Sequence, residues 1–205
     1  MRSVALRDLP RIDVAGCHLH RVRHALGLTA FGSNAYSADS GELLIEPHDE
    51  AGDGGSGRHE ELYVVVAGRA TFEVDGEEID APAGTLVLAQ PEEHREATAT
   101  EDGTWALVIG GKPGAAGPIS PWEYYFAAAA DDDPARRYEI AAEGLEAWPD
   151  HAGLHYNLGC YAALAGMRDK ALEHLRIAYA GNPKTRQWAE EDADFDSIRE
   201  AVRAL

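Results

Sequence analysis

Residues 59–94 read HEELYVVVAGRATFEVDGEEIDAPAGTLVLAQPEEH, and this stretch decides the fold. Residues 62–66 are apolar and mostly β-branched, and apolar side chains alternate with polar ones through residues 69–75. A period of two places the apolar groups on one face of a strand. Asp75-Gly76 predicts a tight hairpin, because a type I′ turn needs positive φ at both central positions. Short strands separated by turn signals predict a β-sandwich or barrel.

Four residues in this stretch have a spacing that indicates a known motif. Glu61 and Gly68 are separated by six residues, a hairpin follows, and Gly84 and His94 come after it. This arrangement resembles the two-motif core of the cupin superfamily, with one residue fewer between Gly84 and His94 than in the family. The resemblance covers roughly residues 35–112 and implies the family's fold, a double-stranded β-helix or jelly-roll barrel.

Cupins with complete motifs bind one divalent metal through three His and one Glu. Here glycine and serine at 54–57 stand where the paired His should be, and Thr98 stands where the family has Asn. If the Gly-rich loop at residues 52–57 is an insertion inside the first motif, His48 takes the place of the first ligand. The resemblance then implies a metal site of His48, Glu61 and His94.

Glu50 and His59 are the alternate ligands, because Glu50 shares a strand face with His48 and His59 shares one with Glu61. These ligand types suit Fe, Mn, Ni or Zn. The alternative is that Glu61 and His94 are remnants at the mouth of the barrel and that no cofactor is bound.

The second half of the chain predicts helices. Residues 110–121 hold GGKPGAAGPISP, a change of composition that marks a linker between a barrel at 1–113 and a helical segment at 114–205. Ser120 before Pro121 and Asp133 before Pro134 are N-cap and N1 pairs.

Pro149 and Pro183 lie 34 residues apart, the period of tetratricopeptide repeats. The helices resemble that family through Leu158, Gly159, Gly166, Ala171, Ala178 and Pro183. The segment holds one repeat that keeps most of the signature, one that has lost most of it, and a closing helical tail. This is too little for a repeat array to be stable alone, so we expect the helices to pack on the barrel or on a second subunit.

The remaining histidines and aromatic residues have structural interpretations. His18 and His20 share one strand face, and we favour a solvated strand over a metal site there. Solvated surface is the expectation for His151, His155 and His174. A cluster of aromatic residues is typical of a core at a domain junction: Trp122, Tyr124, Tyr125 and Phe126.

Composition excludes several partners. The chain has 36 acidic against 18 basic residues and a formal charge of −18, which repels phosphate backbones and anionic lipid. We therefore expect no nucleic-acid or membrane partner.

The chain has only two cysteines, Cys17 and Cys160, and its first sixteen residues carry charges where a signal peptide has an apolar run. These features predict a cytoplasmic protein.

Three hypotheses for function follow. The first is a non-catalytic cupin–tetratricopeptide protein, whose barrel binds a small molecule or is structural and whose helices mediate assembly, as a homodimer or with another protein. The second is a metal-dependent cupin enzyme of dioxygenase, isomerase or decarboxylase type with a reduced ligand set. The third makes the helical half a peptide receptor.

Overall fold

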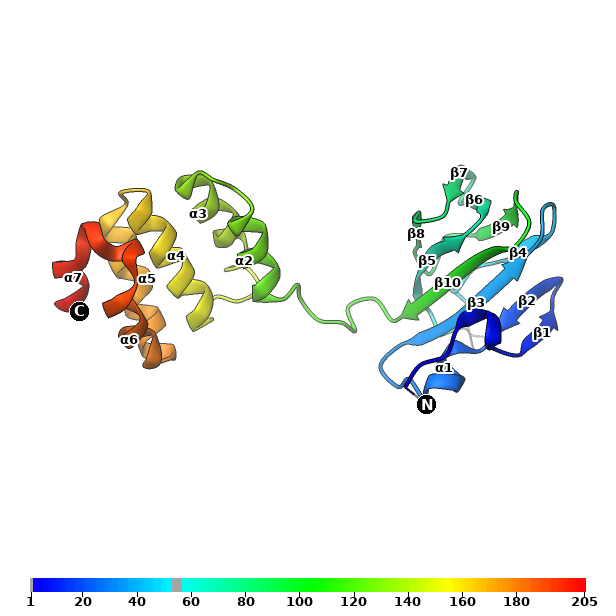
Figure 1. Ribbon diagram of the computed structural model, residues 1–205, viewed down its shortest axis with the longest axis horizontal. Coiled ribbons are helices and arrows are strands. Elements are labelled where there is room, and N and C mark those ends of the chain that lie inside the picture. The colour runs from blue at the N-terminus through cyan, green and yellow to red at the C-terminus, as the bar shows by residue number, and fades with distance from the viewer. Residues whose placement is uncertain (1, 53–56) are drawn as a thin grey trace. The chain divides into compact units, whose positions relative to one another are not determined.

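The computed structural model describes residues 2–52 and 57–205 of the chain, so residues 53–56 of the expected Gly-rich loop lie outside the described residues. The chain divides into two compact units, Met1–Ala116 and Gly117–Leu205. The first is built of strands and the second of helices (Figure 1).

The described part of the N-terminal unit contains ten strands and two short helices. The short helices are η1 (Leu6–Asp8) and α1 (Val22–Leu26). The strands are β1 (Arg11–Val14), β2 (Cys17–His20), β3 (Gly32–Ala38), β4 (Leu43–His48), β5 (Glu60–Ala67), β6 (Arg69–Val74), β7 (Glu77–Pro82), β8 (Leu86–Ala89), β9 (Arg95–Ala99) and β10 (Thr104–Gly111).

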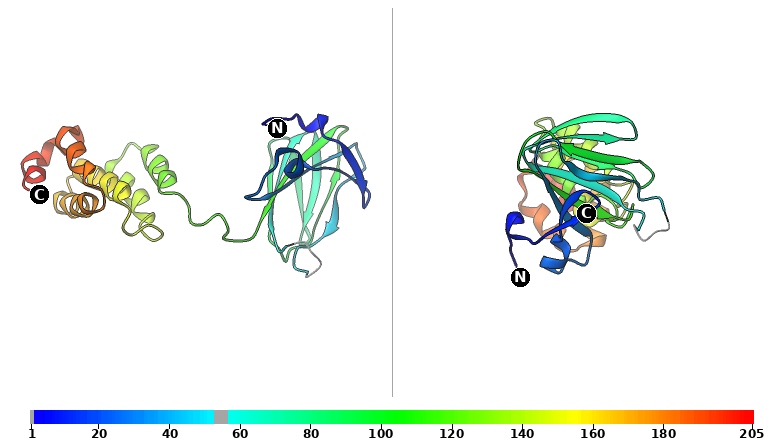
Figure 2. Two further views of the ribbon diagram at one scale, coloured as in Figure 1. Left: turned by 90° about the horizontal axis from the view of Figure 1, so that it is seen from below. Right: turned by 90° about the vertical axis from the view of Figure 1, so that its right-hand side faces the viewer.

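The strands form two antiparallel sheets that face each other (Figure 2). One sheet has the order β1-β2-β3-β10-β5-β8 and the other β4-β9-β6-β7. From β3 onward the chain crosses repeatedly between the sheets, so neighbours in a sheet are distant in sequence except in the β6–β7 hairpin. This strand order is that of a jelly roll. The predicted jelly-roll barrel is therefore confirmed by the topology itself.

The hairpin and the core follow from the alternation in the sequence. Asp75 and Gly76 have φ of 50° and 84°, and Val74 pairs with Glu77 across the turn, as the type I′ prediction requires. Alternate residues of the strands are fully buried between the two sheets, among them Tyr63 and Phe72.

The N-terminal segment covers part of the outer face of the larger sheet. Leu9 and Val22 pack on Ala35 of β3, with Trp105 and Leu107 of β10 beside them. This cover removes apolar side chains from water, and it reaches only the β3–β10 side of the sheet.

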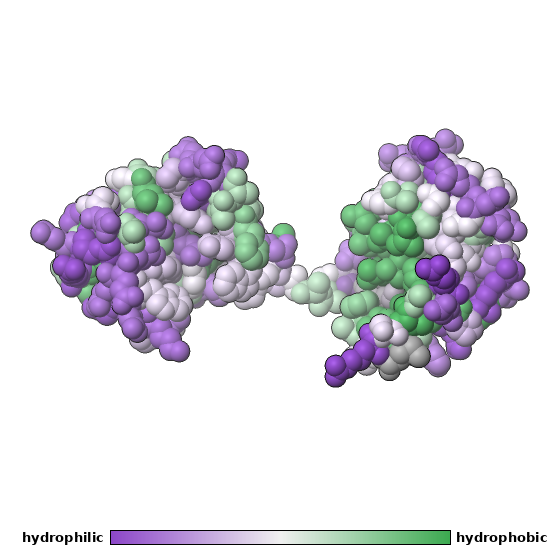
Figure 3. Space-filling view, in the orientation of Figure 1, coloured by the Kyte–Doolittle hydropathy of each residue, from purple (hydrophilic) through white to green (hydrophobic). Residues whose placement is uncertain are grey.

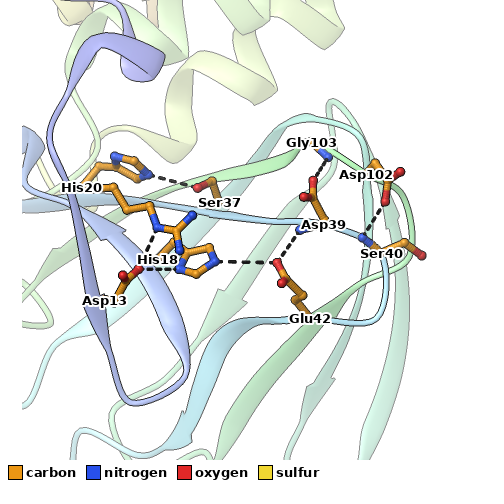
Figure 4. Close-up of polar contacts among 10 residues, drawn as sticks. Asp13, His18, His20, Ser37, Asp39, Ser40, Glu42, Asp102 and Gly103 are labelled. Atoms are coloured by element: carbon orange, nitrogen blue, oxygen red, sulfur yellow. Dashed lines mark hydrogen bonds and ion pairs between the residues drawn. The ribbon is translucent and has the colours of Figure 1, made fainter.

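Polar contacts of His18 and His20 hold the β1–β2 hairpin in place, and they correct the expectation that both histidines are solvated. His18 lies between Asp13 and Glu42, with 2.8 Å from Nδ1 to the Asp13 carboxylate and 3.6 Å from Nε2 to Glu42 (Figure 4). His20 is buried, between the carbonyl oxygen of Leu9 and the hydroxyl of Ser37. The expected solvated strand is therefore wrong for His20, because the N-terminal segment folds over it.

The C-terminal unit consists of helices whose starts the sequence predicted. They are α2 (Pro121–Ala129), α3 (Pro134–Glu143), α4 (Ala152–Leu164), α5 (Arg168–Gly181), α6 (Lys184–Glu191), η2 (Ala193–Ile198) and α7 (Arg199–Arg203). The hydroxyl of Ser120 accepts from the backbone N–H of Trp122, and the carboxylate of Asp133 from that of Ala135, so both N-caps are confirmed. No helix in the described ranges is long and apolar enough to cross a membrane.

Close packing of α4 on α5 explains the small residues at their contact. A Cβ on Gly159 would stand 3.2 Å from Cγ of Leu175, and Ala171 is fully buried. A larger side chain at either position would force the two helices apart. The resemblance to tetratricopeptide repeats stays a prediction.

Two histidines in the helices are core residues, contrary to the expectation of solvated surface. His155 of α4 and His174 of α5 are 3% and 7% exposed, and their Nδ1 atoms lie 2.8 Å apart. Nε2 of His155 is 2.7 Å from the carbonyl oxygen of Pro149, and Nε2 of His174 is 3.1 Å from the hydroxyl of Tyr138. With both rings neutral, every one of these contacts has one donor and one acceptor: Tyr138 donates to His174, His174 to His155, and His155 to Pro149.

The aromatic cluster of α2 is only partly core. Trp122 and Phe126 are 63% and 64% exposed, so the expected buried junction is wrong for these two residues. Tyr124 does pack into the helical core, beside Leu154 and Leu158. The exposed rings stack on each other and leave one face of α2 apolar.

The histidine chain predicts a pH-dependent stability. Burial first, then the neighbouring His155, lowers the pKa of His174 to about 4. Because the unfolded ring titrates near its ordinary value, the unfolded chain binds more protons between about pH 6.5 and 4. The free energy of unfolding should therefore fall by roughly 3 kcal/mol as the pH drops through this window. Urea unfolding followed by helical circular dichroism measures it.

His174→Gln should flatten that dependence, whereas His24→Gln, at an exposed ring of the N-terminal unit, should leave it unchanged. An identical pH slope for wild type and His174→Gln would show that the buried pair does not carry the effect.

Candidate functional site

A polar cavity of about 310 Å³ opens at one end of the barrel. Its walls come from the start of β3, the end of β4, the start of β5 and the end of β10, which meet there because these strands are antiparallel. The lining residues are Arg23, Gly32, Ser33, Asn34, Tyr36, Glu46, His48, Glu50, His59, Glu61, Val108 and Gly110. Most of them carry polar or charged groups, so the cavity suits a small polar molecule.

Glu61 is the most heavily contacted carboxylate of this cavity. The hydroxyl of Tyr63 donates to its Oε2 at 2.5 Å. The same oxygen is 3.5 Å from Nε2 of His48 and 3.3 Å from Nη2 of Arg95. These partners come from both sheets, because Glu61 and Tyr63 belong to β5 whereas His48 and Arg95 are paired residues of β4 and β9. Closing the barrel therefore assembles the group.

The protonation states in this group favour charge on Glu61 and His48. Burial raises the pKa of Glu61, but the contacts with His48 and Tyr63 and the charge of Arg95 outweigh it and hold that pKa below its ordinary value. The contact with Glu61 raises the pKa of His48. Burial and the Glu61 charge raise the pKa of Tyr63, which therefore remains a hydrogen-bond donor.

Arg95 occupies the inward place that the sequence assigned to His94. Residues 95, 97 and 99 of β9 point into the barrel, and Arg95 is completely buried, with Nη1 donating to the carbonyl oxygen of Glu93 at 2.8 Å. His94 immediately before the strand is exposed and lines none of the described cavity. A shift of one residue along a strand reverses the face, so the imidazole expected as a ligand is replaced by a guanidinium.

Three predicted ligands do converge. One ligand atom each of His48, Glu50 and Glu61 lies within 4.8 Å of the others. Glu50 is 8% exposed, and its Oε2 has no hydrogen-bond partner among the described residues. A buried carboxylate oxygen without a partner is costly unless a cation satisfies it.

The orientation of His48 also favours a cation. Its Nδ1 lies 2.6 Å from the carbonyl oxygen of Glu46, so Nδ1–H donates there and Nε2 faces Glu61. A carbonyl partner on the second ring nitrogen is the arrangement that orients histidine ligands in metal sites. A lone pair on Nε2 would be repelled by the carboxylate, so either a proton or a metal ion belongs between them. One His and two carboxylates fit Fe, Mn or Zn by ligand type.

His59 lines the same cavity, without joining the group of three. The sequence interpretation missed Arg95, Tyr63 and a further carboxylate, Glu46, whose buried Oε2 also lacks a described partner. Arg95 shares a strand face with Ala97 and Ala99, but this alternation alone does not tell which face is the interior.

A second cluster, in the helical unit, has a structural explanation. Cys160, Asp192 and Asp194 bring ligand-type atoms together, but Asp192 caps η2 through the backbone N–H of Asp194. Its other carboxylate oxygen accepts from the hydroxyl of Tyr156 at 2.8 Å and lies 3.7 Å from the thiol of Cys160. The cluster holds η2 against α4.

No family model and no curated protein matches this chain. Solved structures do match about half of it. KdgF from a Halomonas species is 20% identical, with a TM-score of 0.42, over 51% of this chain and 86% of that chain. A cupin protein from Bacteroides fragilis is 21% identical, with a TM-score of 0.42, over 55% and 92%. A protein described as a predicted oxalate decarboxylase, from Thermotoga maritima, is 12% identical, with a TM-score of 0.43, over 53% and 96%. Cupins are thus among the proteins that this chain is similar to, and the jelly roll itself follows from the strand order.

Arg95 should be the most costly charged residue to remove. Arg95→Met leaves Glu61 without its permanent positive partner in a buried place, so the free energy of unfolding should fall by about 3–5 kcal/mol. Urea unfolding at neutral pH measures it. Arg58→Met is the matched control, because the Arg58–Glu92 pair is exposed and should be worth at most about 1 kcal/mol. Equal costs for the two substitutions would contradict the role of Arg95.

Proposed function

We propose that the N-terminal unit is a cupin barrel that holds one divalent metal ion through His48, Glu50 and Glu61 and acts as a metal-dependent enzyme on a small polar molecule. The observation that carries the proposal is that His48, Glu50 and Glu61 each bring one ligand atom within 4.8 Å of the others, while Glu50 keeps a buried oxygen without a described partner. Glu50 and His48 both line a cavity large enough for a small substrate.

Each residue of the site has a distinct task in this proposal. His48, Glu50 and Glu61 hold the ion, which when bound supplies a Lewis acid that polarises an oxygen of the substrate. Tyr63 fixes the Glu61 carboxylate by its hydrogen bond, and the charge of Arg95 keeps that carboxylate ionised. Asn34 and Ser33 offer the substrate hydrogen bonds from the wall of β3.

A reaction of dioxygenase, isomerase or decarboxylase type suits this arrangement. The imidazole of His59 lines the cavity and can exchange a proton with a bound molecule. Arg23 adds a guanidinium that can pair with a carboxylate or enolate oxygen of the substrate. We therefore favour an anionic or polyhydroxylated substrate.

Metal binding tests the proposal directly. Protein purified without a His tag is stripped with a chelator and titrated with Mn²⁺ and Zn²⁺ in a calorimeter, and one ion per chain is expected. Glu50→Gln should weaken that binding by at least about tenfold, because it removes a charged ligand. His94→Ala is the matched control and should bind like the wild type, because His94 lies outside the group.

Absence of binding at micromolar Mn²⁺ and Zn²⁺ would contradict the metal site. So would an equal loss of affinity in Glu50→Gln and His94→Ala, because it would place the ion elsewhere.

A second candidate function is a non-catalytic binding barrel without metal. The observation that favours it is Arg95, whose guanidinium lies 3.3 Å from Glu61 and compensates the charge of that carboxylate without an ion. In this version a protonated His48 replaces the ion, and the helical unit mediates assembly or binds a protein partner. An aromatic-walled hollow of about 590 Å³, lined by Trp122, Tyr125, Tyr156 and Trp188, is its candidate contact surface. A melting temperature that neither chelator nor added metal changes would favour this version.

A further inference from the structure

A hollow of about 590 Å³ in the helical unit is walled by four aromatic rings. The rings come from three helices: Trp122 and Tyr125 belong to α2, Tyr156 to α4 and Trp188 to α6. The volume is within the range of small-molecule sites. We call this place the aromatic hollow.

The four rings are arranged as two perpendicular pairs. The planes of Trp122 and Tyr125 meet at 88°, with 6.0 Å between the ring centroids, and those of Tyr156 and Trp188 meet at 84°, with 5.6 Å between the centroids. Perpendicular rings leave a corner between them, whereas stacked rings cover each other. Because Trp122 and Trp188 are 63% and 49% exposed, their faces, which carry the negative part of the ring quadrupole, remain accessible.

The cations of the chain leave these rings free. Within the described residues, the cations that lie over aromatic rings are Lys170 over Tyr138 and Arg186 over Tyr179, and neither ring lines the aromatic hollow. The described lining residues include no lysine or arginine. The ring faces of the aromatic hollow can therefore receive a cation from outside the chain.

Charge around the aromatic hollow favours a cation over an anion. The carboxylate of Asp150 lines it and forms no ion pair with the described residues. Acidic residues outnumber basic ones in residues 117–205, and hydrophilic residues cover much of the visible face of this unit (Figure 3). An anion would be repelled by this surface, whereas a cation is attracted.

The helix ends at the aromatic hollow agree with this sign. The C-terminal end of α5 reaches the hollow at Gly181, and the last carbonyl groups of a helix carry partial negative charge. The N-terminus of α4 also lines the hollow, but Nδ1 of His151 already accepts the backbone N–H of Leu154 there.

A half-buried amide offers a polar contact on the wall of α4. The side chain of Asn157 lines the aromatic hollow and has no hydrogen-bond partner among the described residues. An amide both donates and accepts, so it can hold a hydroxyl or carbonyl group of a ligand. Mostly apolar walls with a few placed polar groups are typical of a site for a small molecule.

We propose that the aromatic hollow binds a small organic cation through its alkylated ammonium group. Alkylated ammonium suits these walls, because its methyl groups contact the ring faces while the rings attract its charge. The carboxylate of Asp150 adds to this attraction, and Asn157 holds the polar end of the molecule. The inference is independent of the metal site in the barrel, and it assigns the hollow to a small molecule instead of a protein partner.

Choline is the probe for this site, and its uncharged carbon analogue, with a tert-butyl group in place of the trimethylammonium group, is the control ligand. Each is titrated into the full chain in the presence of a chelator, and its methyl proton signal is followed by NMR. Ring currents should move the choline signal upfield. Choline should bind at least about tenfold more tightly than the analogue, because the two have the same shape and differ in charge.

Two substitutions locate the bound choline. Trp188→Leu should weaken its binding by at least about tenfold, because it removes one wall of the aromatic hollow. Phe126→Leu is the matched control and should bind like the wild type, since Phe126 is 64% exposed on α2 and does not line the hollow. Circular dichroism verifies that both variants are folded.

Equal affinities for choline and the uncharged analogue would overturn the proposal, because the hollow would then select apolar shape without charge. No upfield shift at about 10 mM choline would overturn it as well, as would equal losses of affinity in Trp188→Leu and Phe126→Leu. A trimethyllysine peptide that binds at least about a hundredfold more tightly than choline would overturn the assignment to a small molecule.

Discussion

The contact of the buried guanidinium of Arg95 with the carboxylate of Glu61 is the constraint on which the site depends. A completely buried positive charge is tolerated only beside a compensating negative charge. Satisfying it brings β9 of one sheet against β5 of the other at the end of the barrel where the cavity opens. The same contact fixes Glu61 where His48, the strand partner of Arg95, can reach it.

Excess negative charge then governs the chemistry of the cavity. Glu46, Glu50 and Glu61 line it, and two of these carboxylates keep an oxygen without a described partner. Arg95 and Arg23 compensate two of these three negative charges, so one remains to attract a cation. The two candidate functions differ in what this cation is: a proton on His48, or a metal ion held with Glu50. Both alternatives follow from the same excess of negative charge.

The two buried histidines of the helical unit have no such imbalance. His155 and His174 are as buried as core residues, but each of their contacts joins a donor to an acceptor when both rings are neutral. Complete pairing makes this chain of hydrogen bonds a structural link between α3, α4 and α5, whereas incomplete pairing makes the barrel cavity a candidate site.

The sequence by itself determined the elements, because their signals are local. Alternation predicted the strands, Asp75-Gly76 predicted the hairpin, and Ser120 and Asp133 predicted the helix starts. Only the tertiary structure decided that Arg95 rather than His94 faces inward, and that His155 is buried. Alternation shows that neighbouring residues of a strand face opposite sides, but which side becomes the interior depends on pairing with strands that are distant in the sequence.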